Sequence, residues 1–330
     1  MVDLTTKYMG LELKNPIIIG SSGLTDNAND IAELEKNGAA AVVLKSIFEE
    51  EIMLETEHLV YLAEKEGYDA KAFDYYDYKL KEEALSSYVK LIQESKKAVD
   101  IPIIASINCV SGHEWPYYAK KIEEAGADAI ELNVFALPSN MHRTSAQNEK
   151  LYFTVAQKVK EEIKIPVSLK ISHYSAALGP LIRDLSNTGI DALVLFNRFW
   201  SPDFDIDNFK VISTNVLSRS EELTLSLRWI AIMANHVACD LSASSGIHDG
   251  KGVIKQILAG ATTTQVVSAI YRHGKPWIGQ MLEELTNWME KHDFTTLDQF
   301  RGKMSQAKSE DPAMYERVQF MRYFRGHEAH

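Results

Sequence analysis

The sequence predicts an α/β protein built as a (β/α)8 barrel, with insertions on the face where the strands end. Three observations predict it: eight short apolar runs, helix-like stretches between them, and glycine or proline at the entry to several runs. The eight runs are Pro16–Gly20, Ala40–Leu44, Pro102–Ile107, Ala129–Leu132, Pro166–Leu169, Ala192–Phe196, Val237–Leu241 and Thr264–Val267. They are continuous rather than alternating, as strands of a parallel sheet buried on both faces are. An open doubly wound sheet is the alternative.

The residues that enter the runs support the repeated unit. Four runs follow a glycine that ends the preceding helix-like stretch: Gly38, Gly126, Gly189 and Gly260. Glycine adopts the left-handed conformation that commonly terminates helices. Two other runs open with Pro102 and Pro166, where the missing N–H of proline costs least. Eight such units predict the closed barrel (TIM barrel).

Two stretches interrupt this rhythm, and both follow a predicted strand. Glu49–Leu80 is charged and rich in tyrosine, and Phe199–Leu223 has little periodicity. Long loops at this end of a barrel commonly act as lids or substrate walls. From Trp277 onward the chain looks helical. We expect residues 1–330 to form one domain, with a helical tail over about 277–330.

Composition excludes several classes of function. The chain has 46 acidic and 35 basic residues, a net charge of −11, which disfavours nucleic-acid binding. No run of about 18 apolar residues predicts a membrane span, and the N-terminus lacks the pattern of a signal peptide. The two cysteines, Cys109 and Cys239, form no CxxC pair, which disfavours zinc and iron–sulfur sites. We expect a cytoplasmic protein without a metal.

Polar residues follow the apolar runs, where the reacting groups of a (β/α)8 barrel lie. These strand-end residues are Ser21, Ser22, Gly23, Lys45, Ser46, Asn108, Asn133, Lys170, Asn197, Ser244, Ser245, Gly246 and Ser268. They include two lysines and no carboxylate. Amides, hydroxyls and lysines suit a large, neutral-to-anionic ligand, whereas a metal would need histidines and carboxylates.

The loops after the seventh and eighth runs, at Ser245-Gly246 and Val267-Ser268, are expected to bind a phosphate through backbone N–H groups. The alternative is that these small residues only form turns. Lys45 and Lys170 could bond a cofactor ring, pair with an anion or form a Schiff base, or could be surface lysines.

The three strand-end asparagines offer donors and acceptors that match the amide edge of a flavin or pyrimidine, although each could be a turn residue. They are Asn108, Asn133 and Asn197. The histidines near the strand ends form no HxH or HxxxH pattern and are interpreted as loop residues.

An ordered set of motifs extends from about residue 4 to about residue 305. The set is Asn15-Pro16 with Ser21-Ser22-Gly23, Leu44-Lys45-Ser46, Ala105–Asn108, Ala125–Asn133, Ser168-Leu169-Lys170 with Asn197, Ser245-Gly246-Ile247, Ala259-Gly260-Ala261 and Phe294–Gly302. Together these motifs resemble the dihydroorotate dehydrogenase family of the soluble, cytoplasmic kind. They are also similar to the pyrimidine-reducing domain of dihydropyrimidine dehydrogenase.

The resemblance implies FMN in the mouth of the barrel and a homodimer. The cofactor-binding residues it implies are Ser21, Ser22, Lys45, Ser46, Asn108, Asn133, Lys170, Asn197, Ser245, Gly246, Val267 and Ser268. Lys45, Lys170 and the backbone near Ser21 would contact the ring, and Ser245 to Gly246 with Val267 to Ser268 the phosphate. The substrate-binding residues it implies are Asn133, Asn140 and Asn197.

In the family, a dihydropyrimidine loses a hydride from C6 to the flavin while a Cys or Ser on a mobile loop removes the C5 proton. Here Ala136 occupies the position of that base and cannot accept a proton. Ser139 is the candidate replacement, with Lys45 as the other candidate catalytic residue. The family's substrate-binding Asn is matched by Ala70 or Lys71. Val267 and Ser245 each replace a usual glycine.

These departures predict an FMN-dependent oxidoreductase of a dihydropyrimidine-like small molecule, with dihydroorotate oxidation reduced, altered or absent. One alternative is a catalytically silent flavin-binding partner protein. Another is a Schiff-base aldolase that uses Lys170. The chain has neither the glycine signature of a Rossmann fold nor a cysteine cluster, so NAD is not expected to bind within it.

Overall fold

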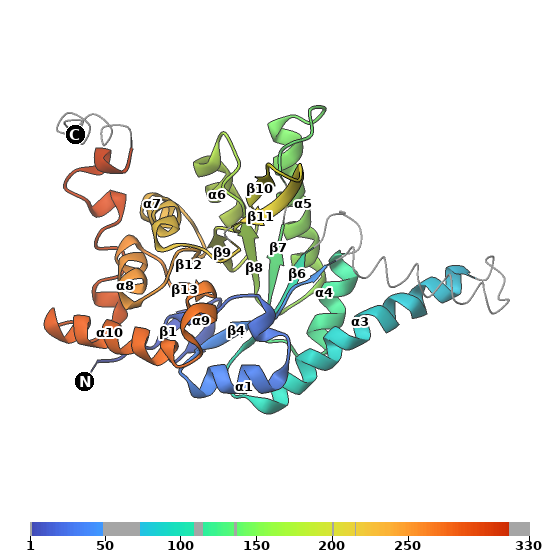
Figure 1. The fold of residues 1–330 in the computed structure, drawn as a ribbon, viewed down its shortest axis with the longest axis horizontal. Coiled ribbons are helices and arrows are strands. Elements are labelled where there is room, and N and C mark those ends of the chain that lie inside the picture. The colour runs from blue at the N-terminus through green and yellow to red at the C-terminus, as the bar shows by residue number, and fades with distance from the viewer. Residues whose placement is uncertain are drawn as a thin grey trace.

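The structure of the chain, a computed structural model, describes residues 2–48, 73–108, 115–134, 137–199, 201–214 and 216–316. Its centre is a closed barrel of eight parallel strands (Figure 1). The strands are β3 (Ile17–Ile19), β4 (Ala41–Val43), β6 (Ile103–Asn108), β7 (Ala129–Asn133), β8 (Val167–Ile171), β9 (Ala192–Leu195), β12 (Asp240–Ser244) and β13 (Thr263–Val266). Pairing of β13 with β3 and of β4 with β6 closes the ring. The predicted fold class is confirmed.

Helices surround the barrel and fill the intervals between strands (Figure 1). They are α1 (Ala28–Lys36), α3 (Phe73–Ala98), α4 (Trp115–Glu124), α5 (Ser145–Glu162), α6 (Leu178–Ser186), α7 (Leu223–Met233), α8 (Gly250–Ala259), α9 (Ser268–His273) and α10 (Trp277–Lys291). Among the described residues, none of these helices combines the length and the apolar character needed to cross a membrane.

Seven predicted strands agree with the structure to within one or two residues, and the seventh along the chain is displaced. The apolar run Val237–Leu241 predicted that strand, but β12 covers Asp240–Ser244. Its register explains the shift, because Asp240 to Ala243 pair with β9 and Ser242 to Ser244 pair with β13. The buried Ser242 of β12 accepts a hydrogen bond from Thr263 Oγ1 at 2.9 Å. Tertiary pairing therefore overrides the apolar pattern.

The strands are buried on both faces, which explains their continuous apolar runs. Ile17 and Ile19 belong to the core between barrel and helices, whereas Ile18 belongs to a smaller cluster inside the barrel. Tyr8 and Leu13 join that inner cluster from a hairpin of β1 (Thr6–Tyr8) and β2 (Leu11–Leu13). This hairpin therefore supplies apolar side chains to the inner core, and the polar strand ends are left for the opposite mouth.

An aspartate clamps the entry to β8. The Asp191 carboxylate accepts hydrogen bonds from the N–H of Val167, at 2.8 Å, and from Lys160 Nζ, at 2.9 Å. The same arrangement recurs one repeat earlier, where Asp128 accepts from the N–H of Ile103 at 2.7 Å. These clamps satisfy backbone donors at the start of two strands and align each strand with its neighbour.

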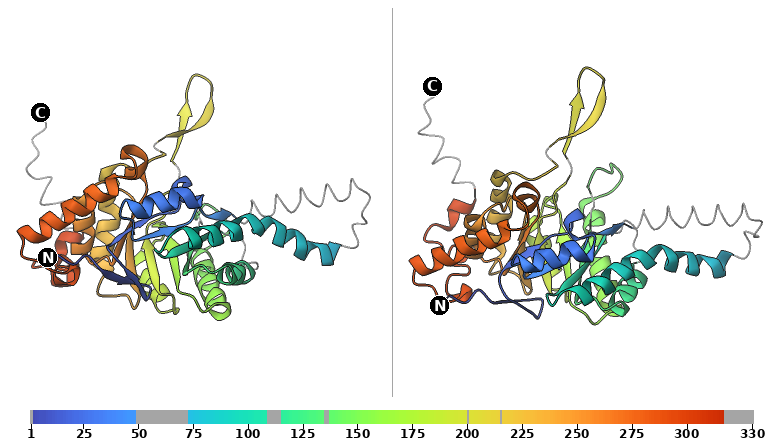
Figure 2. Two further views of the ribbon diagram at one scale, coloured as in Figure 1. Left: turned by 90° about the horizontal axis from the view of Figure 1, so that it is seen from below. Right: turned by 60° about the horizontal axis from the view of Figure 1, so that its bottom comes forward.

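The second insertion contains a hairpin that the sequence did not predict. Strands β10 (Ser201–Asp205) and β11 (Lys210–Thr214) pair antiparallel and stand away from the barrel (Figure 2). The first insertion lies outside the described residues up to residue 72, and its last residues form the start of α3. A short strand β5 (Ile47–Phe48) precedes the insertion.

Within the part of the predicted helical tail that the structure describes, residues 277–316, the α-helix ends at Lys291, the end of α10. Three short 3-10 turns follow, at Leu297–Gln299, Gln306–Lys308 and Pro312–Tyr315. Asp293 has a φ of 59°, a left-handed conformation that cannot continue an α-helix.

The clamp on β8 predicts unequal effects for its two partners. Asp191→Ala should lower the free energy of unfolding by about 1–3 kcal/mol, because the buried N–H of Val167 loses its acceptor. Lys160→Ala removes only a partly exposed ion pair and should cost less than about 1 kcal/mol. Urea unfolding of both variants measures this difference, and equal losses would contradict it.

Candidate active site

A cavity with about 680 Å³ of empty space opens at the carboxyl ends of the strands. We call it the first cavity. It is lined by Ser21, Lys170, Asn197, Arg198, Val216, Ser218, Ser244, Ser245, Gly246, Ile247, Gln265, Val267 and Ser268. Of the twelve residues that the sequence singles out as cofactor-binding, seven therefore line this cavity.

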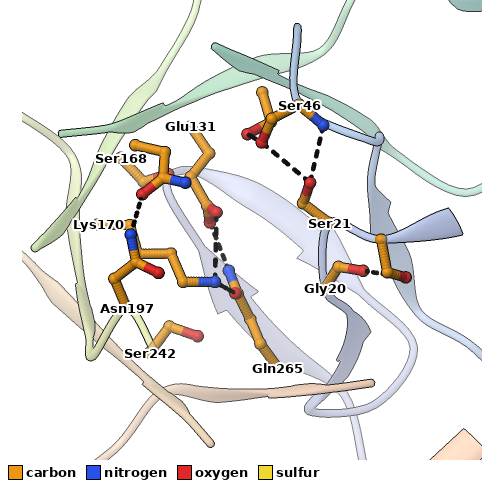
Figure 3. Close-up of polar contacts among 12 residues, drawn as sticks. Gly20, Ser21, Ser46, Glu131, Ser168, Lys170, Asn197, Ser242 and Gln265 are labelled. Atoms are coloured by element: carbon orange, nitrogen blue, oxygen red, sulfur yellow. Dashed lines mark hydrogen bonds and ion pairs between the residues drawn. The ribbon is translucent and has the colours of Figure 1, made fainter. Parts of the chain in front are cut away.

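Lys170 belongs to a polar network at the base of this cavity (Figure 3). Its Nζ donates to Gln265 Oε1 at 2.9 Å and lies 3.7 Å from Glu131 Oε1. Gln265 Nε2 in turn donates to Glu131 Oε2. The three side chains come from β8, β13 and β7, so the network joins strands across the barrel.

The strand-end asparagines lie at one level because the strands are in register. Asn108 is the neighbour of Asn133 across β6 and β7, and Asn133 is the neighbour of Lys170 across β7 and β8. Asn197 Nδ2 donates to Asn133 Oδ1 at 2.5 Å. The structure thus brings together an amide pair and an ammonium, which offer donors and acceptors to a ligand with an amide edge.

Hydroxyl groups form a chain on the opposite side of the barrel mouth (Figure 3). Ser21 Oγ lies 3.0 Å from Ser46 Oγ and accepts from the N–H of Ser46 at 2.9 Å. Ser46 Oγ lies 2.7 Å from the buried Ser106 Oγ. Ser46 therefore holds the Ser21 side chain through hydrogen bonds. It is not itself among the residues lining the first cavity.

Ser218, on the connection between β9 and α7, links the loops at the other end of the first cavity. Its N–H donates to Ser268 Oγ at 2.9 Å, its carbonyl accepts from Arg272 Nη2 at 3.1 Å, and its Oγ accepts from the N–H of Gly246 at 3.4 Å. His248 Nε2 lies 3.2 Å from the same Oγ. Burial, and then the charge of Arg272, lower the pKa of His248, so its imidazole is neutral at pH 7.

The donor set of the first cavity fits an organic anion with a hydrogen-bonding ring. Its lining has serine hydroxyls, the side-chain amides of Asn197 and Gln265, the ammonium of Lys170 and the guanidinium of Arg198. The nearby carboxylate of Glu131 is buried and faces the lysine. In the described part of the chain, no three His, Cys, Asp or Glu side chains gather as metal ligands would. The residues present therefore suit a phosphorylated cofactor such as FMN.

A second cavity, of about 880 Å³, adjoins the first and shares Asn197, Arg198, Ser244 and Ser245 with it. Its apolar walls include His173, Tyr174, Phe196 and Phe199. The rings of His173 and Tyr174 lie 4.3 Å apart, and those of Tyr174 and Phe199 lie 5.0 Å apart. Burial lowers the pKa of His173, so this wall is uncharged at pH 7.

Arg198, at the junction of the two cavities, is held by Glu222 through bonds of 2.7 and 3.3 Å. Burial raises the pKa of Glu222, but the hydrogen bonds from Arg198 and from the N–H of Arg219 outweigh it and lower the pKa overall. The junction therefore carries a neutralised ion pair, which fixes the guanidinium in place.

Seven site residues singled out from the sequence do not line either cavity: Ser22, Lys45, Ser46, Asn108, Asn133, Ser139 and Asn140. Lys45, Ser139 and Asn140 are exposed, and Ser22 caps a short 3-10 turn (Gly23–Thr25). Ala136, Ala70 and Lys71 lie outside the described residues. The roles given to all of these residues stay predictions.

Sequence reasoning missed Glu131, Gln265, Ser218 and Arg198. It considered only the tips of the strands, whereas Glu131 and Gln265 lie one or two positions before a tip. A charged residue inside the apolar run Ala129–Leu132 was a usable signal, because charges are rarely buried without a partner. Ser218 and Arg198 lie in the aperiodic insertion or at its start and gave no signal.

The described cysteine, Cys239, is not a reactive group of this site. Burial, followed by the charges of Asp240 and Asp191, raises its pKa to about 12. Its thiol is therefore protonated at neutral pH and is a poor nucleophile. The other cysteine of the sequence, Cys109, lies outside the described residues.

Comparison of the sequence with known proteins identifies the family to which the chain belongs. The sequence model of the dihydroorotate dehydrogenase family matches residues 67–289. The chain is 26% identical over 316 residues to the catalytic subunit of dihydroorotate dehydrogenase B (NAD(+)) of Thermoplasma volcanium, which covers 92% of this chain and 98% of that protein. The corresponding subunit of Methanocaldococcus jannaschii is 25% identical over 305 residues, 88% of this chain and 95% of the relative.

A second kind of relative is a subunit of a dihydropyrimidine dehydrogenase. The chain is 23% identical over 319 residues to the NAD-dependent dihydropyrimidine dehydrogenase subunit PreA of Escherichia coli K12. The match covers 91% of this chain and 76% of that protein.

Gly246 allows the loop that borders the first cavity to pack against α7. Its φ is +75°, and a Cβ there would lie 2.1 Å from the backbone nitrogen of Leu223. Gly246→Ala should therefore lower the free energy of unfolding by roughly 3 kcal/mol or more. Gly126→Ala is the control, because Gly126 also has a positive φ but no described atom lies within 4 Å of such a Cβ. It should cost only about 1–2 kcal/mol. Similar losses of stability in denaturant titrations would contradict the steric argument.

Proposed function

Because the chain belongs to the dihydroorotate dehydrogenase family and is an oxidoreductase that acts on CH–CH bonds, we propose that it binds FMN in the first cavity and oxidises a dihydropyrimidine-like cyclic amide. One observation carries the proposal: Lys170, the Asn133–Asn197 pair and a serine-lined loop cluster converge on one cavity. These are the groups needed for a flavin ring edge and for a phosphate.

The cofactor proposal divides the first cavity into two ends. Ser21, Lys170 and Asn197 would hold the ring, and the Ser245-Gly246 and Val267-Ser268 segments would hold the phosphate. Hydroxyls and backbone N–H groups bind phosphate without adding charge, and Arg272 behind Ser218 adds a favourable field. When bound, FMN supplies the acceptor for two electrons that leave the substrate.

The second cavity supports a place for the substrate. It adjoins the first at Asn197, and its aromatic wall can cover a planar ring and exclude water from it. Asn133 and Asn197 would orient the amide edge of the substrate, because each side chain offers a donor and an acceptor. The remaining wall is uncharged, apart from the Arg198–Glu222 pair.

The loop between β7 and α5 contains Ser139 and Asn140, and this loop is proposed to remove the proton from the substrate. Ser139 would accept the proton from substrate carbon and Asn140 would contact the substrate, once this exposed loop covers the cavity. Ala136 at the family's base position supports a substrate or rate different from that of dihydroorotate oxidation. Lys45 is retained as a proposed catalytic and cofactor-binding residue.

The catalytically silent flavin-binding protein is the second candidate, favoured by the exposure of Ser139 outside both cavities. The aldolase is disfavoured by the network around Lys170. A Schiff base requires an uncharged amine in an apolar pocket. Here the amine donates to Gln265 and faces the carboxylate of Glu131.

The purified protein should carry one FMN per chain, visible as the absorbance of oxidised flavin. If the protein is purified without flavin, added FMN should bind to it, and the fluorescence of the FMN should be quenched. Riboflavin should bind more weakly by at least about tenfold, because it lacks the phosphate and forfeits the hydrogen bonds to it. A colourless protein that binds neither compound would overturn the cofactor proposal.

Anaerobic mixing with substrate tests the base. Ser139→Ala should slow bleaching of the flavin by about 10²–10⁴-fold, the usual contribution of a general base. Ser213→Ala, on the exposed hairpin, is the matched control and should leave the rate unchanged. An unchanged rate in Ser139→Ala would remove Ser139 as the base. Rapid bleaching of the wild type by dihydroorotate would show that the family's activity is intact despite Ala136.

A further inference from the structure

We infer that Gln265 and Glu131 are positioning residues that fix the direction of the Lys170 ammonium toward the ligand in the first cavity. The inference rests on the proposed function, and it assigns a role to two buried side chains that do not themselves lie at strand tips. Lys170 and Gln265 both line the first cavity, and Glu131 lies beneath them.

Burial makes the three side chains depend on one another. The Lys170 side chain is 12% exposed, Gln265 is 3% exposed and Glu131 is 1% exposed. An ammonium and a carboxylate buried to this degree are tolerated only when paired and hydrogen-bonded. The network provides that pairing, since Gln265 bridges the two charges from the far side of the barrel.

The charges on either side fix the orientation of the Gln265 amide. Its Nε2 faces Glu131, which as a carboxylate only accepts, and its Oε1 faces Lys170, which only donates. A 180° flip of the Gln265 amide would place its Oε1 against the carboxylate of Glu131 and its Nε2–H groups against the ammonium of Lys170. The amide dipole is therefore locked, and it fixes one of the three N–H directions of the ammonium.

Glu131 attracts the ammonium by its charge rather than through a hydrogen bond. Its Oε1 lies 3.7 Å from Lys170 Nζ and has no hydrogen-bond partner among the described residues. Because Gln265 holds one N–H and Glu131 attracts the ammonium from within the barrel, Lys170 has further N–H groups to offer to a ligand in the first cavity. A flexible four-carbon side chain thus becomes a fixed donor, which lowers the entropy lost on binding.

Stability alone is a weak reason for such a network. Replacing buried ion pairs by apolar side chains of similar size is often neutral or stabilising. The same barrel has an apolar interior at its other end, where Ile18, Val43 and Ile104 fill the space. The buried pair of Lys170 and Glu131 lies at the end that borders the first cavity.

Gln265→Met tests the inference without changing the net charge. The variant should bind both FMN and riboflavin about tenfold more weakly, because the ring rather than the phosphate loses a directed donor. The midpoint potential of bound FMN should also fall, since a fixed cation favours the electron-rich reduced ring. Gln256→Met is the control: Gln256 is equally buried, on α8, and its Nε2 bonds Ser226 Oγ at 2.8 Å. It should change neither quantity.

A double-mutant cycle shows whether the effect passes through Lys170. In a Lys170→Met background, Gln265→Met should change flavin affinity by less than about twofold. Glu131→Gln is the second variant and should also weaken binding, because it releases the amide of Gln265. Tighter binding in Glu131→Gln would show that Glu131 acts only as an opposing charge and would overturn its positioning role.

The outcomes separate this inference from the proposed function. A wild-type protein that binds neither flavin would overturn the proposed function and, with it, this inference. Wild-type binding with unchanged affinity and potential in Gln265→Met would overturn the inference alone. Equal losses of flavin affinity in Gln265→Met and Gln256→Met would show a general effect on folding and would also overturn the inference.

Discussion

Closure of the eight parallel strands is the constraint on which the rest of this molecule depends. Parallel register places Asn108, Asn133 and Lys170 at one level, although they are far apart in the sequence. Closure through β13 and β3 then brings Gln265 and Ser21 to the same mouth. Because every strand ends on this side, polar residues that follow apolar runs necessarily converge there.

The barrel divides its interior between two kinds of packing. At one end, the β1–β2 hairpin joins the apolar side chains of the inner cluster. At the other end, hydroxyls, amides and a lysine with its carboxylate partner take the place of apolar groups. Burying polar groups is costly unless each has a partner, so the end that borders the first cavity depends on bonds made between strands. The inferred positioning of Lys170 on β8 by Glu131 on β7 and Gln265 on β13 follows from this dependence.

The residues proposed for the cofactor are brought together more completely than those proposed for the substrate proton. Lys170, Asn133 and Asn197 come together as the family resemblance implies. Ala136 stands where a Cys or Ser is usual, and the candidate replacement Ser139 is exposed. If FMN binds the first cavity as proposed, the change at Ala136 is expected to alter the substrate or the rate rather than the redox chemistry.

The sequence by itself determined the barrel, the approximate place of its strands and the chemical character of their tips, because apolar runs and helix-ending glycines are local signals. It also carried the departure at Ala136. Only the tertiary structure decided that Glu131 and Gln265 meet Lys170, that Ser218 links the loops beside the cavity, and that Lys45 is exposed. Those facts depend on which strands face each other across a closed barrel and on how an aperiodic insertion folds back. Neither is encoded in the spacing of residues along one strand.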